Sequence, residues 1–410
     1  MTAPGTSPRP TMSPEAGPPE AGACPTIDLE ELGLDRGGHL LLKQALATVP
    51  VGGRVEVRGK APALAVHVRA WARAAGHGFD WPYVTRGGAA DARRRGAETT
   101  GGPAEVVDRP APSWGLAARG AVVETGGPAF AFALDDKAMV WTDAAAGIYR
   151  QAVANQWDPA TAVDWDEPFE LADEVEAAVV QVMTYLVENE NAALVVPARF
   201  LGRIHPHFRE VVGVLAVQVA DEARHVEVFS RRAAMKVGGA LGLSTVGGQA
   251  SLLTLLEEPD FALAHFLLSV LGEGTFLSLL SFLERYAPDP VTRRITHLAL
   301  ADEARHVAFG MAHMEAVLES DPGLRSRLAT AVRRRHDVLL HTAGLNAEVF
   351  DALVVLAAGA LTPTAIAAGY ARVQQLQAEM DEGRRRRLAK LGFTPAEATG
   401  LAELHTRNFM

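Results

Sequence analysis

The heptapeptide ADEARHV occurs twice in this chain, at residues 220–226 and 301–307, and no other stretch repeats at comparable length. Both copies lie in segments with helical periodicity, so a glutamate and a histidine three residues apart share one helix face in each copy. A carboxylate and an imidazole at this spacing can hold one metal ion, so the duplication predicts two similar halves of one metal site. The two pairs are Glu222 with His225 and Glu303 with His306.

A site for two ions also needs a carboxylate from each of two further helices. The apolar segment 261–286 has one acid in its middle, Glu273. A lone carboxylate on a buried stripe is costly unless it is protonated or paired with a cation, and a metal ion is a suitable partner. The segment 179–196 offers Glu188 and Glu190. Glu190 shares its face with apolar residues and is the preferred ligand, while Glu188, on a more polar face, is the alternative.

The composition changes along the chain and predicts several domains. Residues 1–25 are rich in Pro, Gly, Ser and Thr, which predicts a disordered tail. Residues 26–80 alternate strand and helix patterns, which predicts a small α+β domain. Residues 81–167 predict a linker with short strands, including a strand pair in AFAFALDDKAMVWTD. Residues 168–410 have helical periodicity, so the expected fold class is α+β multi-domain and mainly an all-α bundle.

Turns rich in Gly and Pro divide the helical region into candidate helices. They span 168–202, 207–237, 249–257, 259–286, 290–318, 323–343, 346–359 and 363–391.

Charge and composition exclude several classes of partner. The formal net charge of −10 argues against nucleic acid and anionic lipid. The single cysteine, Cys24, excludes a disulfide framework and favours a reducing cytoplasm. We find no export signal, and no apolar run that approaches the roughly 18 to 20 residues needed to span a bilayer. We therefore expect a cytoplasmic protein without nucleic-acid or membrane partners.

With the two motif copies and the isolated glutamates placed, residues 168–318 resemble the carboxylate-bridged di-iron proteins of the ferritin-like superfamily, whose bacterial oxygenases carry an E…DExRH pattern. The resemblance implies a ferritin-like bundle that holds two iron ions, with manganese as an alternative metal. The implied ligands are Glu190, Glu222, His225, Glu273, Glu303 and His306, with Glu188 as the alternative to Glu190.

The same resemblance gives roles to the acids and bases that flank the ligands in both copies. It implies that Asp221 is hydrogen-bonded to His306, and that Asp302 is hydrogen-bonded to His225, which orients each imidazole. Arg224 and Arg305 are then expected to neutralise these acids, although arginines on a helix are often solvated surface residues.

The resemblance further implies an O2-dependent di-iron oxidase or oxygenase. Such an enzyme oxidises a small organic substrate by hydroxylation, N-oxygenation or desaturation, in specialised metabolism, and takes electrons from a reductase or ferredoxin. A homodimer is expected. Phe229 stands where ribonucleotide reductase radical subunits carry a tyrosine, which argues against a tyrosyl radical. The alternatives are a di-manganese catalase-like enzyme, a non-enzymatic iron-binding ferritin-like protein, and an adaptor with a structural metal site.

The segment 26–80 is similar to TusA-type sulfur-carrier proteins, whose GLxCP segment supplies a persulfide cysteine. Here the corresponding residues run from Gly33 to Gly37, and Arg36 stands in the place of the cysteine. Sulfur transfer needs a thiolate, so this degenerate unit is expected to serve in interaction or packing. Two basic clusters, 333–335 and 384–387, are expected to dock an acidic donor, to bind an anionic substrate or to be solvated.

Overall fold

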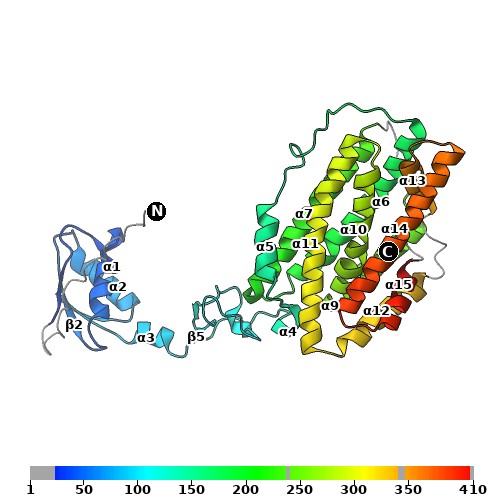
Figure 1. Cartoon of the computed structure of the whole chain (residues 1–410). Coiled ribbons are helices and arrows are strands. Elements are labelled where there is room, and N and C mark those ends of the chain that lie inside the picture. The colour runs from blue at the N-terminus through cyan, green and yellow to red at the C-terminus, as the bar shows by residue number, and fades with distance from the viewer. Residues whose placement is uncertain (1–23, 237–240, 340–346, 407–410) are drawn as a thin grey trace, which may run out of the picture. The chain divides into compact units, whose positions relative to one another are not determined.

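The computed structural model describes residues 24–236, 241–339 and 347–406, and the chain splits into two compact units. Unit 1 contains residues 1–99 and 122–127, and unit 2 contains residues 100–121 and 128–410. Both are drawn in Figure 1. The disordered tail expected at residues 1–25 lies outside the described residues, apart from its last two positions.

Unit 1 contains a four-stranded sheet with the order β1-β2-β4-β3, in which β1 pairs parallel to β2 and the other pairs are antiparallel. Alternate side chains of β2 are buried, including Val55 and Val57, because one face of the sheet packs against two helices (Figure 1). The elements are β1 (Thr26–Asp28), α1 (Gly38–Ala47), β2 (Arg54–Arg58), α2 (Leu64–Ala74), β3 (Gly78–Asp80) and β4 (Tyr83–Thr85).

The sheet continues beyond residue 80, where the sequence placed the end of this domain. Val84 of β4 pairs with Val55 and is fully buried, so β4 belongs to the core of unit 1 rather than to a linker. The strand pair expected in 129–143 is absent, since Leu134 makes one bridge to Ile204 and a short helix follows. The elements between residues 86 and 154 are α3 (Ala89–Arg94), β5 (Glu98–Thr99), β6 (Val122–Val123), α4 (Lys137–Val140) and α5 (Ala145–Ala154).

Unit 2 is a bundle of long helices, and each helix expected between residues 168 and 391 has an observed helix in its place (Figure 1). The structure adds α5, a π-helical segment and a final helix that the sequence pattern did not predict. The helices are α6 (Asp173–Leu201), α7 (Arg209–Ala234), α8 (Val246–Leu256), α9 (Phe261–His265), the π-helix η4 (Phe266–Glu273), α10 (Gly274–Tyr286), α11 (Pro290–Ser320), α12 (Leu324–Leu339), α13 (Ala347–Ala358), α14 (Pro363–Lys390) and α15 (Pro395–Thr406).

Two helical hairpins, α6/α7 and α10/α11, form the centre of this bundle, and α7 also packs against α11. Local sequence fixes where α11 begins. The Asp289 side chain accepts a hydrogen bond from the backbone N–H of Thr292, and Pro290 occupies the first turn of α11. Helix α5 packs against α7 and α11, while α13 and α14 cover α6 and α10. These contacts bring α6, α7, α10 and α11 around one interior.

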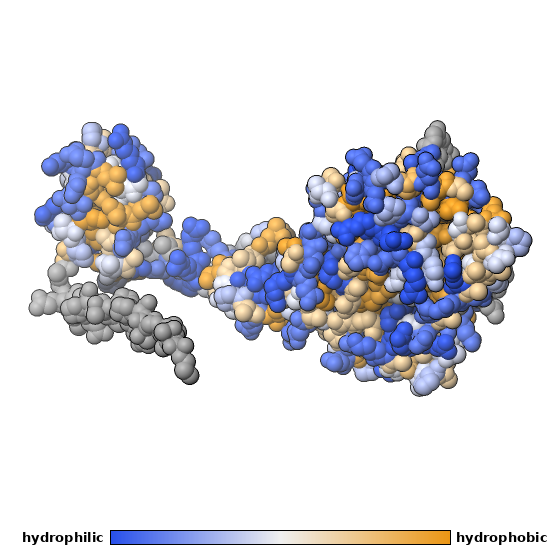
Figure 2. Space-filling view, turned by 45° about the horizontal axis from the view of Figure 1, so that its top comes forward, coloured by the Kyte–Doolittle hydropathy of each residue, from blue (hydrophilic) through white to orange (hydrophobic). Residues whose placement is uncertain are grey.

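The helical run Phe261–Tyr286 corrects one expectation from the sequence. By length and composition alone its 26 residues are sufficient to cross a membrane, so the statement that no apolar run approaches that length was wrong. In the bundle, 78% of its most apolar window is buried, as in the core helix of a globular domain. Figure 2 shows hydrophilic side chains over much of the face of unit 2 that is in view, with apolar areas between them.

Candidate metal centre

The two motif copies face each other across the interior of unit 2. Glu222 and His225 project from α7, and Glu303 and His306 project from α11. All four side chains are buried, with between 0% and 4% of their surface exposed. The spacing of three residues places each Glu and His on one helix face, and the packing of α7 on α11 brings the two faces together.

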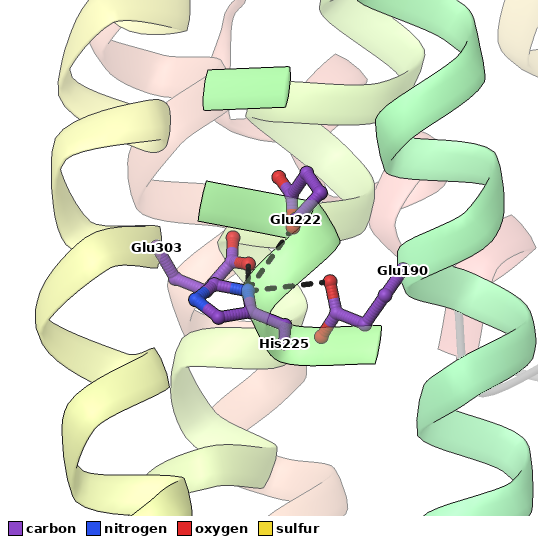
Figure 3. A group of neighbouring side chains, drawn as sticks. All are labelled: Glu190, Glu222, His225 and Glu303. Atoms are coloured by element: carbon purple, nitrogen blue, oxygen red, sulfur yellow. Dashed lines mark hydrogen bonds and ion pairs between the residues drawn. The ribbon is translucent and has the colours of Figure 1, made fainter. Parts of the chain in front are cut away.

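Six side chains form two overlapping groups of potential ligand atoms. Within each group, the oxygen and nitrogen atoms all lie within 4.8 Å of one another. Glu222 and Glu303 belong to both groups, which places them where bridging carboxylates would lie in a dinuclear site. The first group, drawn in Figure 3, is Glu190, Glu222, His225 and Glu303, and the second is Glu222, Glu273, Glu303 and His306.

The Nδ1 atoms of both histidines point at the carboxylates. Nδ1 of His225 lies 3.1 Å from Oε2 of Glu222, 3.4 Å from Oε1 of Glu303 and 3.6 Å from Oε2 of Glu190. Nδ1 of His306 lies 3.1 Å from Oε1 of Glu222 and 3.5 Å from Oε2 of Glu303. Nδ1 is therefore the atom that each imidazole would offer to a metal ion.

The Nε2 atoms point away from the carboxylates, toward two buried aspartates. Nε2 of His306 lies 3.1 Å from Oδ2 of Asp221, and Nε2 of His225 lies 3.2 Å from Oδ2 of Asp302. This is the cross-pairing between motif copies that the resemblance implied. A carboxylate only accepts a hydrogen bond when ionised, so Nε2 of each ring carries a proton, and Nδ1 is the atom that can offer a lone pair to a metal ion once it has lost its own proton.

The two motif arginines neutralise these aspartates and are not solvated surface residues. Arg224 pairs with Asp221 and Arg305 pairs with Asp302, and 14% and 13% of the two arginine side chains are exposed. Burial would raise the pKa of Asp302, but the hydrogen bond and charge of His225, with smaller contributions from Trp157 and Arg305, lower it to about 2. Asp302 is therefore ionised at neutral pH.

Two residues before α6, which the sequence analysis did not single out, complete this network. Trp157 donates its indole N–H to Oδ2 of Asp302 at 2.7 Å, and its ring stacks on His225 with centroids 6.4 Å apart. Gln156 donates to Oδ1 of Asp221 at 3.0 Å. Both lie in the region expected to be a linker, and their role depends on where the chain passes over α7 and α11, which no local pattern encodes.

On the first predicted helix, the structure favours Glu190 over Glu188. The side chain of Glu190 is 1% exposed and belongs to the first ligand group. Glu188 is only half-buried and belongs to neither group. The two residues are separated by about 200° around a helix of 3.6 residues per turn, so only one of them can face the interior.

The fourth carboxylate is held by a π-helix. Glu273 is the last residue of η4 and accepts a hydrogen bond of 2.9 Å from Nε2 of Gln218, a buried residue one turn before Glu222. A π-helix departs from the regular α-helical hydrogen-bond pattern, and Nε of Arg387 donates to the carbonyl of Val270 within it at 2.7 Å.

The basic cluster 384–387, to which Arg387 belongs, is therefore partly inside the bundle. Arg384 is 1% exposed, and only Arg385 and Arg386 of the cluster lie on the surface.

The surroundings favour the protonated form of two glutamates and both histidines of the centre. Burial and the neighbouring Glu222 raise the pKa of Glu190 well above its ordinary value, and burial and Glu303 do the same for Glu273. Burial would lower the pKa of His225, but hydrogen bonding to Asp302 and other carboxylates raises it well above the ordinary value. The pKa of His306 is raised in the same way, mainly by the charges of Glu222 and Glu303.

Several buried polar atoms in the centre have no hydrogen-bond partner among the described residues, and they suit a pair of divalent cations. Buried polar groups are normally hydrogen-bonded, so such a cluster is unusual without a ligand. Four glutamates and two divalent ions also balance in charge, while the two aspartates are balanced by arginines. The atoms are Oε1 of Glu190, Oε1 of Glu222, Oε2 of Glu273, both carboxylate oxygens of Glu303, and Nδ1 of His306.

Fold and site together define a helical bundle with a carboxylate- and histidine-lined centre of dinuclear type. No protein-family description and no curated protein matches the chain. Among solved structures it is similar to an R2-like ligand-binding oxidase variant with an aerobically reconstituted Mn/Fe cofactor, with 20% identity over 60% of this chain and 93% of that chain and a TM-score of 0.46. Another variant, with an Fe/Fe cofactor, has 20% identity over 60% and 92% of the chains and a TM-score of 0.45.

Proposed function

We propose that this protein is an O2-dependent oxidoreductase that holds two metal ions, in the first instance iron, and oxidises a small organic substrate. The observation that carries the proposal is the pair of overlapping ligand groups that share Glu222 and Glu303. Mixed carboxylate and imidazole ligands suit iron and manganese, and a pair of reduced iron ions supplies the electrons that reduce dioxygen.

The chain's own residues hold and orient these ions. Glu190 and His225 would bind one ion, Glu273 and His306 the other, and Glu222 and Glu303 both. Hydrogen bonds from the two Nε2 atoms to aspartates fix both imidazole rings with Nδ1 toward the ions. Because all six ligand side chains are at most 4% exposed, bulk water is excluded from the centre.

The test is anaerobic reconstitution with ferrous iron, followed by metal analysis and stopped-flow mixing with oxygenated buffer. We expect about two irons per chain and a transient visible absorption, following the ligand set of such bundles. Glu273→Gln is expected to bind less iron and to lose the transient, whereas Glu188→Gln is expected to behave as the unchanged protein. Binding of two irons without any reaction with oxygen would contradict an oxidase.

Metal content and stoichiometry separate the alternatives. A manganese pair that disproportionates hydrogen peroxide would point to a catalase-like enzyme. Uptake of many more than two irons per chain would point to iron storage. Hydroxylation, N-oxygenation and desaturation remain alternatives for the reaction, and a reductase or ferredoxin is the proposed electron donor.

For unit 1 we propose an interaction role rather than sulfur transfer. Arg36 ends a short 3-10 turn at the position where the sulfur-carrier resemblance requires a cysteine, and Cys24 lies on a different segment, with its Sγ 3.2 Å from the carbonyl of Arg54. Leu40 and Val66 leave apolar surface on α1 and α2, with 61% and 65% of the residues exposed. Deletion of unit 1 is expected to leave the metal content unchanged.

A further inference from the structure

The outward sides of α1 and α2 in unit 1 expose apolar side chains. Both helices cover the same face of the sheet, and their buried stripes contain Leu42 on α1 and Val68 on α2 (Figure 1). Leu40 and Val66 lie two residues before them, about 200° around each helix, and are 61% and 65% exposed. Leu41, beside Leu40, is 42% exposed. Figure 2 shows an apolar area on the face of unit 1 that is in view, with hydrophilic side chains around it, and such areas often mark interaction sites.

Each of the two helices also carries cations one turn beyond its exposed apolar residue. Lys43 follows Leu40 by three residues on α1, and Arg69 follows Val66 by three residues on α2, with Arg73 one turn further along the same face. All three cationic side chains are exposed. None of them forms an ion pair within the described part of the chain, so their charges are available to another molecule.

The opposite face of the sheet is charged as well, but its charges are neutralised within the chain. Neither α1 nor α2 contains an acid, and from residue 36 to residue 79 the only acid is Glu56. Its side chain alternates with the buried side chains of β2 and therefore lies on the far face of the sheet, where it pairs with Arg58 at 3.0 Å. Arg54 on that face lies 3.5 Å from Asp80.

Unit 1 is the cationic part of an anionic chain. Residues 24–99 contain 11 Lys and Arg against 8 Asp and Glu, while the rest of the chain contains 28 Lys and Arg against 41 Asp and Glu. An acidic protein is therefore repelled by most of the chain and attracted by unit 1. Within unit 1, the outward sides of α1 and α2 combine unpaired cations with exposed apolar side chains, as a protein-binding surface does.

We propose that the outward surface of α1 and α2 is a docking site for an acidic electron-carrier protein. The apolar side chains contact an apolar centre on the carrier, and the cations pair with carboxylates around that centre. The docking surface consists of Leu40, Leu41, Lys43, Val66, Arg69 and Arg73.

The choice of an electron carrier rests on the proposed function. When one O2 is consumed in a hydroxylation, an N-oxygenation or a desaturation, it takes up four electrons, of which the substrate supplies two. The other two electrons come from outside, one from each of two reduced carriers, and two protons come from water. Opposite charges speed the encounter more than they tighten the complex, which suits a carrier that must leave after each transfer.

The first experiment titrates the metal-free full chain with an oxidised, acidic plant-type [2Fe–2S] ferredoxin and measures binding by calorimetry. We expect binding at about 50 mM salt that weakens at least about tenfold at about 300 mM salt. The double substitution Lys43→Glu with Arg69→Glu is expected to weaken binding at least about tenfold at the lower salt concentration. Its matched control is Arg94→Glu with Arg95→Glu, which changes the net charge equally at two exposed arginines of unit 1 outside the docking surface.

The apolar part of the surface is tested separately. Leu40→Ser is expected to weaken binding at least about fivefold, because it removes a contact from the centre of the docking surface. Val122→Ser is the control, since Val122 is 66% exposed and also belongs to unit 1 but lies outside the surface. Equal affinities of the charge-reversed protein and its control would overturn the docking site, as would the absence of ferredoxin binding at low salt.

Vesicles of phosphatidylserine and phosphatidylcholine test a membrane as the alternative occupant. Sedimentation of the unchanged protein with these vesicles, without binding of the ferredoxin, would assign the surface to anionic lipid and overturn the proposal. The titration uses metal-free protein, so its result does not depend on the metal centre. Ferredoxin binding by a chain that takes up no metal would support the docking site and contradict the proposed function.

Discussion

Nε2 of His225 on α7 donates a hydrogen bond of 3.2 Å to Oδ2 of Asp302 on α11, so the acid of one motif copy orients the imidazole of the other. Each seven-residue copy is therefore incomplete by itself. The ring of His225 can present Nδ1 to the centre only while α7 and α11 remain in contact, which couples the metal site to the packing of the bundle.

Asp302→Asn is expected to weaken metal binding about 10- to 100-fold, because the amide no longer holds the ring of His225 with a full charge. Competition with a chelator under anaerobic conditions measures the affinity. Asp337→Asn, at a side chain that is 77% exposed on α12, is the control. An affinity equal to that of the control would show that the aspartate does not tune the imidazole.

Substitution of a carboxylate that belongs to both ligand groups is expected to remove more metal than substitution of a carboxylate that belongs to one group. Glu222→Gln removes an atom from both ligand groups and is expected to leave less than about one ion per chain. Glu190→Gln affects the first group alone and is expected to leave about one ion. Metal analysis after gel filtration counts the ions. Similar losses in the two variants would mean that Glu222 does not bridge.

Metal affinity is expected to rise with pH. Glu190 and Glu273 have raised pKa values and so do His225 and His306, and each must lose its proton before it binds a cation. Calorimetric titration at about pH 6 and about pH 8 in buffers of different ionisation enthalpy measures affinity and proton release together. Affinity that is independent of pH would argue that the centre is already deprotonated.

The metal-free protein is expected to show the opposite trend in stability. Groups with raised pKa values bind more protons in the folded state, so their stabilising contribution is complete below the unfolded pKa values and is lost as pH rises through the folded values. The unfolded pKa values are about 4.3 for Glu and about 6.5 for His, so the decline begins near pH 4.3 for the two glutamates and near pH 6.5 for the two histidines, and continues to higher pH. Urea unfolding of metal-free and metal-loaded protein from about pH 4 upward checks the difference in sign.

Arg387→Gln is expected to destabilise unit 2 by about 1–3 kcal/mol, because the buried carbonyl of Val270 in the π-helix loses a charged donor. Arg386→Gln is the matched control, since the Arg386 side chain is 72% exposed and its Nε lies 3.9 Å from Oε1 of Glu382, in a weak surface ion pair. Chemical denaturation measures both. An equal effect of the two substitutions would show that the basic cluster acts only through its overall charge.

The sequence was sufficient to predict the long helices of the bundle and the residues that line the candidate metal centre. Helical spacing places Glu222 with His225, and Glu303 with His306, whatever surrounds them. The isolation of Glu273 in an apolar helix predicted it as a candidate metal ligand, and the structure places it in the second ligand group. The preference for Glu190 over Glu188 followed from the polarity of the neighbouring helix face, and the structure places Glu190 in the interior.

Other features depended on contacts between segments that lie far apart in the sequence. Trp157 and Gln156 reach the two aspartates from a stretch with no periodic pattern. The basic cluster 384–387 was compatible with a surface role until packing against the π-helix buried Arg384 and engaged Arg387. A charged residue is buried only where a partner is supplied, and a local pattern does not show that partner.

The sequence by itself determined which residues share a helix face, because side-chain direction repeats with the local backbone geometry of a helix. It therefore determined the two Glu/His pairs and the carboxylates that face the same interior. The tertiary structure alone decided which acid orients which histidine and how Gln218 meets Glu273, because these contacts join residues 77 and 55 positions apart. Such pairings depend on the register in which the helices pack, and no single helix contains that information.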